Sequence, residues 1–341
     1  MTAFPRPSVD DRVMWNIVTA LSTYPLVLVA HDLKLFSRLA AGARSRDELT
    51  NDLKLHDRPM RAILDVCTSL GLVRREDRRY VLTPIAEQYL LERSPVYMGA
   101  FLDALIVNFN QVYTFESMRR AVAADAPQVY RGEALFDTHE QQAALAAAFT
   151  RAMHGHSMAP ALAWPDQIDL ASARHLLDLG GGSGAHAIAA AMRWPHMRAT
   201  VVDLPPVCDV AREYINDFGV AARVDATPGD LFTGELPAAD VHFYADIFHD
   251  WPIDRVEQMM RRSFDALPGN GLILIHEMVA DDDGGPLTVA GYSAAMLVWT
   301  QGRQYNRAEL AEMLMATGFV DVKTTSTFGY WAIVSARKPQ A

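Results

Sequence analysis

The sequence predicts an α/β protein in which a helical N-terminal half precedes a mostly parallel sheet whose last strand is reversed. After about residue 165, short apolar stretches alternate with helical patterns, which is typical of a parallel sheet covered on both faces. The last two apolar stretches, "FVDVKTTST" and "GYWAIVSARKP", are separated by little more than a turn, so they should pair antiparallel. We therefore predict two domains, residues 1–160 and 161–341.

The first 83 residues predict two successive helical modules. Helical apolar spacing over residues 11–40, interrupted near Pro25, predicts a helical hairpin. Residues 45–84 then indicate a capped helix, a turn, a second helix over about 57–70 and a short hairpin. That order of elements is a winged helix-turn-helix.

A winged helix can bind DNA, and the second helix of this module was considered for that role. Its outer face carries Arg58 and Arg61 beside Asp57 and Asp65, so it is electrically mixed. The side chains of the whole chain carry a net charge of −10, whereas binding to a duplex needs positive charge on at least one face. We expect no nucleic-acid partner, and a module used for packing or dimerisation.

The apolar helices that follow, up to about residue 160, indicate a homodimer, because stretches such as "MGAFLDALIVNF" leave more apolar surface than one chain easily covers. A self-contained helical core is the alternative. The sequence has no run of 18 consecutive apolar residues, the length that a membrane span needs, and its first residues do not resemble a targeting signal. Cys67 and Cys208 have no metal or redox spacing, which suits a reducing compartment. We expect a cytoplasmic protein without a membrane partner.

The second half contains five apolar strands, "RHLLDL", "RATVVDL", "ARVDAT", "DVHFYA" and "GLILIHEM", with helices beginning near Ala185, Pro206 and Ile253. Together with the reversed final strand they predict a Rossmann-like sheet. In such open sheets ligands bind beyond the carboxyl ends of the strands, near the point where the strand order reverses.

A glycine-rich turn follows the first of these strands. Gly180, Gly182 and Gly184 would let a ligand approach the backbone and the following helix N-terminus, and with Asp203 after the next strand they also fit a nicotinamide cofactor. Asp178, two residues before the first glycine, favours a cationic ligand over a pyrophosphate. The reversed strand also disfavours a dinucleotide-binding repeat. A cationic cofactor with a ribose and no phosphate is S-adenosyl-L-methionine (SAM).

The stretches "LLDLGGGSG", "VVDLP", "GDLF", "FHDWP" and "HE", with the winged-helix module, resemble the SAM-dependent small-molecule O-methyltransferases typified by plant caffeic acid and bacterial antibiotic-tailoring enzymes. The resemblance spans nearly the whole chain. It implies a class I methyltransferase sheet, an N-terminal dimerisation domain, a small aromatic substrate from secondary metabolism, S-adenosyl-L-homocysteine as the product, and no metal.

The same resemblance implies the cofactor contacts. The turn at Gly180 would lie under the methionine part, Asp203 would hold the ribose, "GDLF" would border the adenine, and Ser157 would reach the carboxylate unless it is only a helix-surface serine. The implied set is Asp178, Gly180, Gly182, Asp203, Leu204, Asp230, Leu231, Phe232 and Ser157.

A histidine follows the strand "DVHFYA", which delivers His249 to the ligand edge of the sheet just before Pro252 begins the next helix. An imidazole with a pKa of about 6.5 can accept the proton of a phenol, whose own pKa is about 10, as the oxygen attacks a methyl group. We predict that His249 is a general base. The alternative is that it only caps the loop.

Two further side chains complete the predicted catalytic group. Glu277 ends the adjacent strand and would orient the imidazole. Where the resembling enzymes have a second carboxylate this sequence has Gln304, which can hydrogen-bond but carries no charge. That departure favours a more acidic hydroxyl, or a carbon or nitrogen acceptor. Asp246, one helical turn before His249, stands where a lysine, an arginine or an apolar residue is usual, and no role is predicted for it.

By the same resemblance, apolar side chains would line the acceptor pocket, although such residues are more often part of a core. The predicted set is Met296 and Trp299 on "YSAAMLVWTQG", Phe149, Met153, and Asn108 with Phe109 as a roof. His154 and His156 are two apart, so on a helix they should point to different faces and make a poor metal pair. His276 is predicted to be a packing residue.

Three functions are compatible with these patterns. The leading one is a dimeric O-methyltransferase that acts on the hydroxyl of a small aromatic metabolite with His249 as base. A C- or N-methyltransferase on the same scaffold should retain turnover in His249→Ala, because such acceptors need no prior deprotonation. A winged-helix regulator that senses SAM or a metabolite would need specific, salt-dependent binding to DNA.

Overall fold

The computed structural model describes residues 6–129 and 135–340, and the chain divides into two compact units between Ile106 and Val107. The predicted boundary at residue 160 lies instead inside helix α9 (Ala143–Ala163). This helix packs against α10 (Ala185–Arg193) and α11 (Pro205–Asp217), which belong to the second unit. Residues 107–160 are therefore grouped with the sheet rather than with the N-terminal module.

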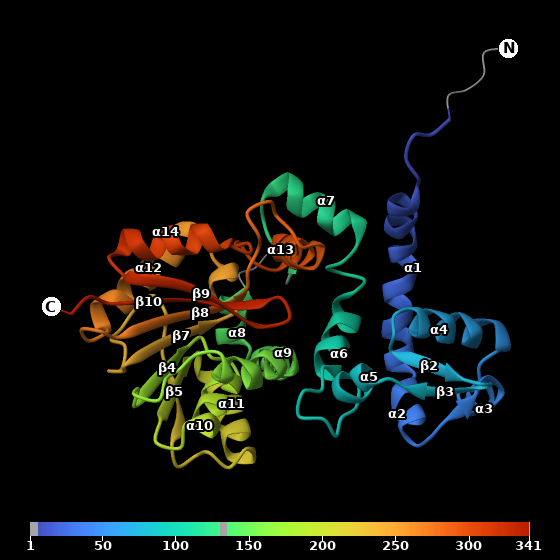
Figure 1. Cartoon of the computed structure of the whole chain (residues 1–341), viewed down its shortest axis with the longest axis horizontal. Coiled ribbons are helices and arrows are strands. Elements are labelled where there is room, and N and C mark those ends of the chain that lie inside the picture. The colour runs from blue at the N-terminus through green and yellow to red at the C-terminus, as the bar shows by residue number, and fades with distance from the viewer. Residues whose placement is uncertain (1–5, 130–134, 341) are drawn as a thin grey trace. The chain divides into compact units, whose positions relative to one another are not determined.

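The first unit contains the order of elements predicted over residues 45–84, two helices joined by a turn and followed by a hairpin (Figure 1). A capping box starts the first of these helices, in which Ser45 accepts from the N–H of Glu48 and the Glu48 side chain accepts from the N–H of Ser45. The elements are α1 (Arg12–Asp32), α2 (Leu35–Ala40), β1 (Arg44–Ser45), α3 (Arg46–Asp52), α4 (Asp57–Ser69), β2 (Val73–Glu76), β3 (Arg79–Leu82), α5 (Pro84–Tyr89) and α6 (Gly99–Asn108).

The predicted break near Pro25 is wrong, because α1 continues through this residue and the chain turns at Leu33 and Lys34. A proline removes one backbone hydrogen bond from a helix and often only bends it. The reversal comes from Lys34, whose φ of 56° lies in the left-handed region.

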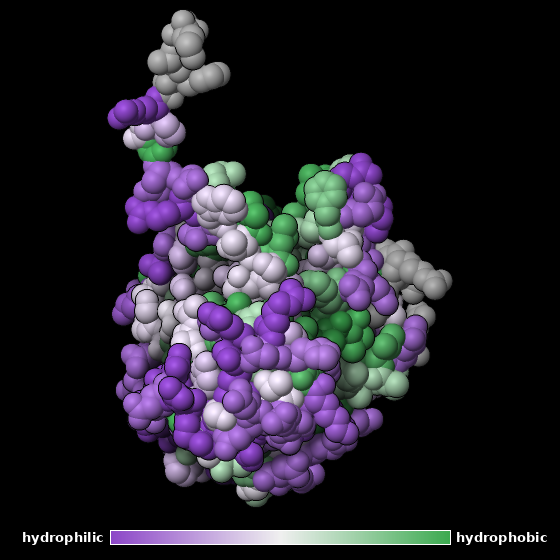
Figure 2. Space-filling view, turned by 90° about the vertical axis from the view of Figure 1, so that its right-hand side faces the viewer, coloured by the Kyte–Doolittle hydropathy of each residue, from purple (hydrophilic) through white to green (hydrophobic). Residues whose placement is uncertain are grey.

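Helix α1 exposes a row of large apolar side chains. By length and composition it is the one helix in the described part of the chain that could cross a membrane. Figure 2 views the molecule from the side that faces right in Figure 1, and hydrophilic residues cover most of the lower part of this view while hydrophobic residues are exposed among them higher up. The large apolar residues of α1 that are more than half exposed are Val13, Met14, Trp15, Ile17, Val18, Leu21 and Tyr24.

The second unit is built on a seven-stranded sheet of order β6-β5-β4-β7-β8-β10-β9 (Figure 1). β10 is antiparallel to both β8 and β9, which confirms the predicted reversed strand. The strand order reverses at β4, so the turn that follows β4 lies where ligands bind in open α/β sheets. The strands are β4 (His175–Leu179), β5 (Arg198–Asp203), β6 (Val224–Pro228), β7 (Val241–Ala245), β8 (Leu272–Met278), β9 (Val320–Phe328) and β10 (Trp331–Arg337).

Helices cover both faces of this sheet, as the continuous apolar strands predict. Successive residues of β4 point to opposite faces of the sheet. Leu176 packs with α10 and α11, whereas Leu177 packs with the helices of the opposite face. Those helices are α12 (Ile253–Ala266) and α14 (Arg307–Thr317). The remaining elements are α7 (Phe115–Ala124), α8 (Leu135–Gln141), α13 (Leu287–Trp299) and the short 3-10 helices η2 (Trp164–Asp166) and η3 (Phe248–Asp250).

Candidate functional site

The glycine turn after β4 is tight at its first residue and open at its third. Gly180 and Gly182 have φ values of 70° and 56°, which glycine adopts without strain. A Cβ atom at Gly180 would collide with the side chain of Ile247, whereas one at Gly182 would meet no atom within 4 Å. The backbone at Gly182 is thus open to the approach of a ligand.

Two carboxyl groups lie at this turn, that of Asp178 fully buried and that of Asp203 half-buried. Asp203 accepts hydrogen bonds from the N–H of Gly182 at 2.8 Å and of Leu204 at 2.7 Å, and so fixes the turn to the end of β5. Asp178 accepts through Oδ2 from the N–H of Ala187 at 3.1 Å. In the described residues its Oδ1 atom has no hydrogen-bond partner.

Burial raises the pKa of both carboxyl groups. For Asp178 burial outweighs the hydrogen bond from Ala187 and raises the pKa to about 7, and for Asp203 it raises the pKa to about 6 against two backbone hydrogen bonds. Neither carboxylate pairs with a lysine or an arginine in the described part of the chain. A cation bound beside them would compensate the negative charge of both groups.

The "GDLF" segment borders the glycine turn. Asp230 is exposed and accepts from the N–H of Phe232 at 2.8 Å. A side-chain carbon of Leu231 lies 3.4 Å from the position of a Cβ at Gly180. Phe232 packs edge-on against Trp251, with ring centroids 4.7 Å apart. The segment thus connects the glycine turn with the residues that follow His249.

Helix α9 also contacts the glycine turn, through a residue that the sequence analysis did not select. His154 Nδ1 lies 2.8 Å from the hydroxyl of Ser183. Burial lowers the pKa of His154 to about 4, so this imidazole is neutral. Ser157, predicted to reach the cofactor, lies half-buried one turn further along the same helix.

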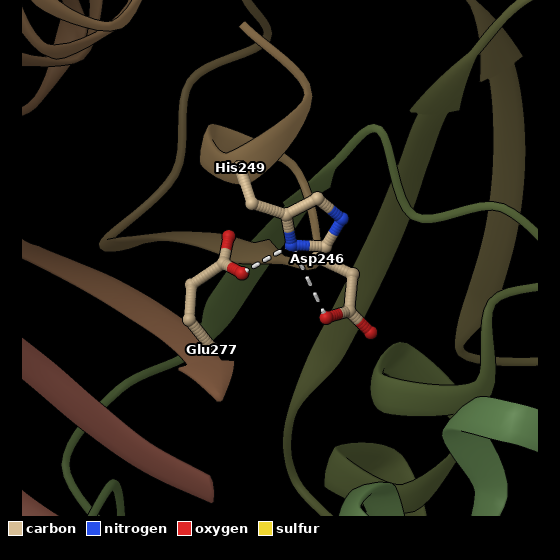
Figure 3. Close-up of side chains that lie close together, drawn as sticks. All are labelled: Asp246, His249 and Glu277. Carbon is tan, nitrogen blue, oxygen red and sulfur yellow. Dashed lines mark hydrogen bonds and ion pairs between the residues drawn. The ribbon is translucent and has the colours of Figure 1, made fainter. Parts of the chain in front are cut away.

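His249 is held by Glu277 at the carboxyl ends of the adjacent strands β7 and β8. It is 4% exposed, and its Nδ1 atom lies 2.6 Å from Oε2 of Glu277 (Figure 3). The other oxygen, Oε1, accepts from the N–H groups of Ile247 and Phe248, each at 3.0 Å. Since an ionised carboxylate only accepts hydrogen bonds, Nδ1 donates to it and Nε2 is the nitrogen that can exchange a proton.

Three carboxylates act on this imidazole. Besides Glu277, Oδ1 of Asp246 lies 3.6 Å from Nδ1, and Oδ1 of Asp250 lies 3.6 Å from Nε2. Burial disfavours the imidazolium, but Glu277, Asp250 and Asp246 together outweigh it and raise the pKa of His249 to about 10. Burial also raises the pKa of Asp250 to about 7.

Gln304 lies in a segment that packs on the His249 turn, without a recorded contact to the imidazole. Its side chain is 3% exposed, and neither amide atom has a hydrogen-bond partner in the described residues. Its N–H donates to Ser293 Oγ at 3.1 Å. Two residues earlier, a Cβ at Gly302 would collide with the carbonyl oxygen of His249.

The predicted acceptor residues come from several elements of the chain. Phe149 and Trp299 pack against the same small core, and the indole N–H of Trp299 donates to Tyr113 Oη at 2.8 Å. Met296 is buried, and Met153 and Asn108 are half-buried.

Tyr292 of α13 was not predicted and lies beside the histidines. Its ring stacks on His156 with centroids 5.7 Å apart and faces the edge of His249 at 5.6 Å. Burial, with the nearby carboxylates, raises its pKa well above the ordinary value. His276 is fully buried, with Nε2 2.8 Å from Thr327 Oγ1.

Comparisons with known proteins agree across the whole chain. Residues 115–320 match the model of an O-methyltransferase domain, and residues 15–92 match that of an O-methyltransferase dimerisation domain. The chain is 33% identical to 3-hydroxy-5-methyl-1-naphthoate 3-O-methyltransferase of Streptomyces sahachiroi, over 94% of this chain and 92% of that protein. It is 30% identical to the tetracenomycin polyketide synthesis 8-O-methyl transferase of Streptomyces glaucescens, over 92% and 93%. The crystal structure of human N-acetylserotonin methyltransferase in complex with SAM has a TM-score of 0.83 and 25% identity, over 98% of this chain and 100% of that one.

Proposed function

The chain belongs to the O-methyltransferase family, and from that premise we propose that it transfers the methyl group of SAM to a hydroxyl of a small aromatic metabolite. The two Streptomyces relatives are named for O-methylation of a hydroxynaphthoate and of a polyketide, both secondary metabolites. Nothing in the comparisons supports the alternative of a winged-helix regulator.

The residues of the glycine turn fit this cofactor. The backbone is open at Gly182, and a fully buried carboxylate, Asp178, and a half-buried one, Asp203, lie beside it without a salt bridge to a basic side chain among the described residues. When bound there, SAM would supply a methyl group on a positively charged sulfur, and transfer of that methyl to the acceptor oxygen would leave S-adenosyl-L-homocysteine. We propose that Leu204, Ser157 and the "GDLF" residues complete the contacts.

His249 has the geometry of a base for this reaction. Glu277 holds Nδ1 and leaves Nε2 to take the proton of the acceptor hydroxyl. Against the effect of burial, the carboxylates raise the pKa of His249 to about 10, close to that of a phenol, so transfer of the acceptor's proton to the neutral imidazole costs little. Because the neutral form gains population as the pH rises, the rate should rise with pH. The contact of 2.6 Å between His249 and Glu277, beyond two adjacent strands, is the observation that carries the proposal.

One assay tests the proposed reaction. The purified protein is incubated with methyl-labelled SAM and a panel of phenols, catechols, hydroxyquinones, hydroxynaphthoates and anthranilates, and the methyl group is located by mass spectrometry and NMR. We expect labelled methyl ethers, and we expect His249→Ala to lose about 10²- to 10⁴-fold in rate while it still binds S-adenosyl-L-homocysteine. Methyl groups found on carbon or nitrogen, with turnover retained in His249→Ala, would contradict O-transfer.

We further propose that the protein is a cytoplasmic homodimer in which α1 packs against a second copy. The family model of the dimerisation domain matches residues 15–92, which include most of α1 and the winged-helix module that follows it. An exposed apolar row on one helix is well suited to a self-complementary interface. We also propose that the helices between residues 107 and 160 form a lid over the acceptor site.

A further inference from the structure

We propose that Asp246, held from behind by His156, is a second carboxylate for His249 and a positioning residue for methyl transfer, in place of the charge that Gln304 lacks. The inference rests on the proposed function. It gives a role in methyl transfer to Asp246 and His156, for which the sequence predicted no role.

Asp246 lies between two buried histidines. Its Oδ2 atom is 3.2 Å from Nε2 of His156 on α9, and its Oδ1 atom is 3.6 Å from Nδ1 of His249. Each of the three residues is at most 8% exposed. Figure 3 shows Asp246 and Glu277 approaching the same ring nitrogen from different sides. That nitrogen therefore lies between two carboxylates.

The free oxygen of Asp246 is the one directed at His249. In the described residues Oδ1 has no hydrogen-bond partner, whereas Oδ2 is engaged by His156. A buried carboxylate oxygen without a hydrogen bond is costly unless a positive charge lies nearby. An imidazolium at His249 is such a charge, so the pair is stable when His249 holds its second proton.

The backbone of Asp246 is held in an unusual conformation that aims its side chain. Its φ of 55° is left-handed, a conformation that few residues with a Cβ adopt, although aspartate and asparagine adopt it more readily than the others. Its N–H donates to the carbonyl of His276 at 3.2 Å, which anchors the turn to β8.

The ionisable groups around this pair are mostly acidic. Burial lowers the pKa of His186 to about 4, so it contributes no charge near neutral pH, and Tyr292 stays protonated because burial and the carboxylates raise its pKa. Excess negative charge favours the imidazolium. The groups that face Asp246 and His249 are Asp250 of η3, Glu277 of β8, His156 of α9, His186 of α10 and Tyr292 of α13.

The charge of Asp246 thus stabilises the imidazolium of His249, which the neutral amide of Gln304 cannot do. Glu277 fixes the ring and supplies one charge, and Asp246 supplies another without competing for the hydrogen bond of 2.6 Å. His156 stops Asp246 from turning away. With both carboxylates beside it, His249 binds the proton of the acceptor hydroxyl more tightly than it would with Glu277 alone.

The test replaces Asp246 by an isosteric neutral residue. Asparagine adopts left-handed backbone readily and can still accept from His156, so Asp246→Asn should fold. The nitrogens of the histidine rings are followed by NMR from pH 5 to 11 in ¹⁵N-labelled protein bound to S-adenosyl-L-homocysteine. His249→Gln identifies the His249 signals. We expect the titration of His249 to move down by at least about one pH unit.

Activity provides a second readout. The rise of kcat/KM with pH should shift to lower pH in Asp246→Asn, with a lower plateau and a KM for the acceptor within about twofold of the parent. Asp265→Asn removes the same charge from an exposed position on α12 and should change neither profile. His156→Gln should give a smaller shift in the same direction.

The NMR titration keeps the inference separate from the proposed function. If no acceptor is methylated, the proposed function fails, yet the titration still tests Asp246. A titration of His249 in Asp246→Asn that superimposes on the parent would overturn the inference. Should Asp246→Asn fail to fold, His156→Gln decides by the same titration, and an unchanged His249 pKa in that variant overturns it.

Discussion

Glu277 bonds both the imidazole of His249 and the backbone that carries it, with Oε2 2.6 Å from Nδ1 and Oε1 accepting from two consecutive N–H groups. The register of the sheet explains the contact. Ala245, the last residue of β7, pairs with His276 of β8, so the turn after β7 meets the next residue, Glu277. One carboxylate thus sets the position of the ring and favours its charged form.

Glu277→Gln separates these two roles. The amide oxygen can still accept from the backbone, so the protein should fold, but the neutral side chain no longer stabilises an imidazolium. We expect kcat to fall by about 10²- to 10³-fold, with the Kd for S-adenosyl-L-homocysteine within about twofold of the parent. Steady-state kinetics and calorimetry measure both. Glu312→Gln, exposed on α14, is the matched control, and an unchanged kcat in Glu277→Gln would show that its charge is not used.

Gly302→Ala tests whether the segment before Gln304 positions the turn that carries His249, the proposed base. The added methyl would collide with the carbonyl oxygen of His249, so the turn must shift. Displacements of about 1 Å at a catalytic group can cost about 10²-fold in rate, and we expect a loss of that order in kcat. Gly291→Ala on α13 adds the same methyl where no atom lies within 4 Å, and it should retain activity. Equal rates for the two variants would contradict this prediction.

Asp178→Asn should stabilise the protein free of ligand at alkaline pH. The pKa of Asp178 rises from 3.8 in an ordinary environment to about 7 when buried. Its contribution to the free energy of unfolding is therefore fully present below the unfolded pKa and is lost as the pH rises through about 7. We expect the variant to exceed the parent by on the order of 2 kcal/mol at pH 8.5, and the difference to shrink towards pH 5. Chemical denaturation at both pH values measures it.

The same substitution should weaken cofactor binding. A cation beside Asp178 lowers the pKa of its carboxyl group, so binding near pH 7 should release protons, and affinity for SAM should rise from pH 6 to pH 8. Calorimetry in buffers of different ionisation enthalpy counts the protons. The exposed control Asp169→Asn should behave as the parent, whereas undiminished proton release in Asp178→Asn would rule out Asp178 as the source.

The sequence predicts the sheet well because its signals are local. Strands buried on both faces read as continuous apolar runs, and the short connection before β10 forces its reversal. The proximity of His249 and Glu277 was also predictable, since residues that follow neighbouring parallel strands meet at one edge.

Long-range side-chain contacts could not be predicted in the same way. His156 and Asp246 are 90 residues apart and lie on different elements, and their contact depends on how α9 rotates on α10 and α11. The pattern "MHGHSM" does not indicate that His154 reaches the glycine turn while His156 reaches the catalytic one. The sequence contains one local indication that Asp246 is functional, an unusual charge three residues before His249. It contains no such indication for His156.

Leu21→Lys tests the proposed use of α1. Leu21 is 83% exposed in the single chain, and its burial against a second copy would contribute at least about 1.5 kcal/mol. A two-fold interface counts the change twice, so the loss of about 3 kcal/mol should weaken association more than about 100-fold. We expect light scattering after size-exclusion chromatography to show a dimer for the parent and a monomer for the variant. Met315→Lys, at an exposed apolar site on α14, should remain dimeric. A parent that is monomeric, or that partitions into lipid vesicles through α1, would show that the apolar row serves another partner than a second copy.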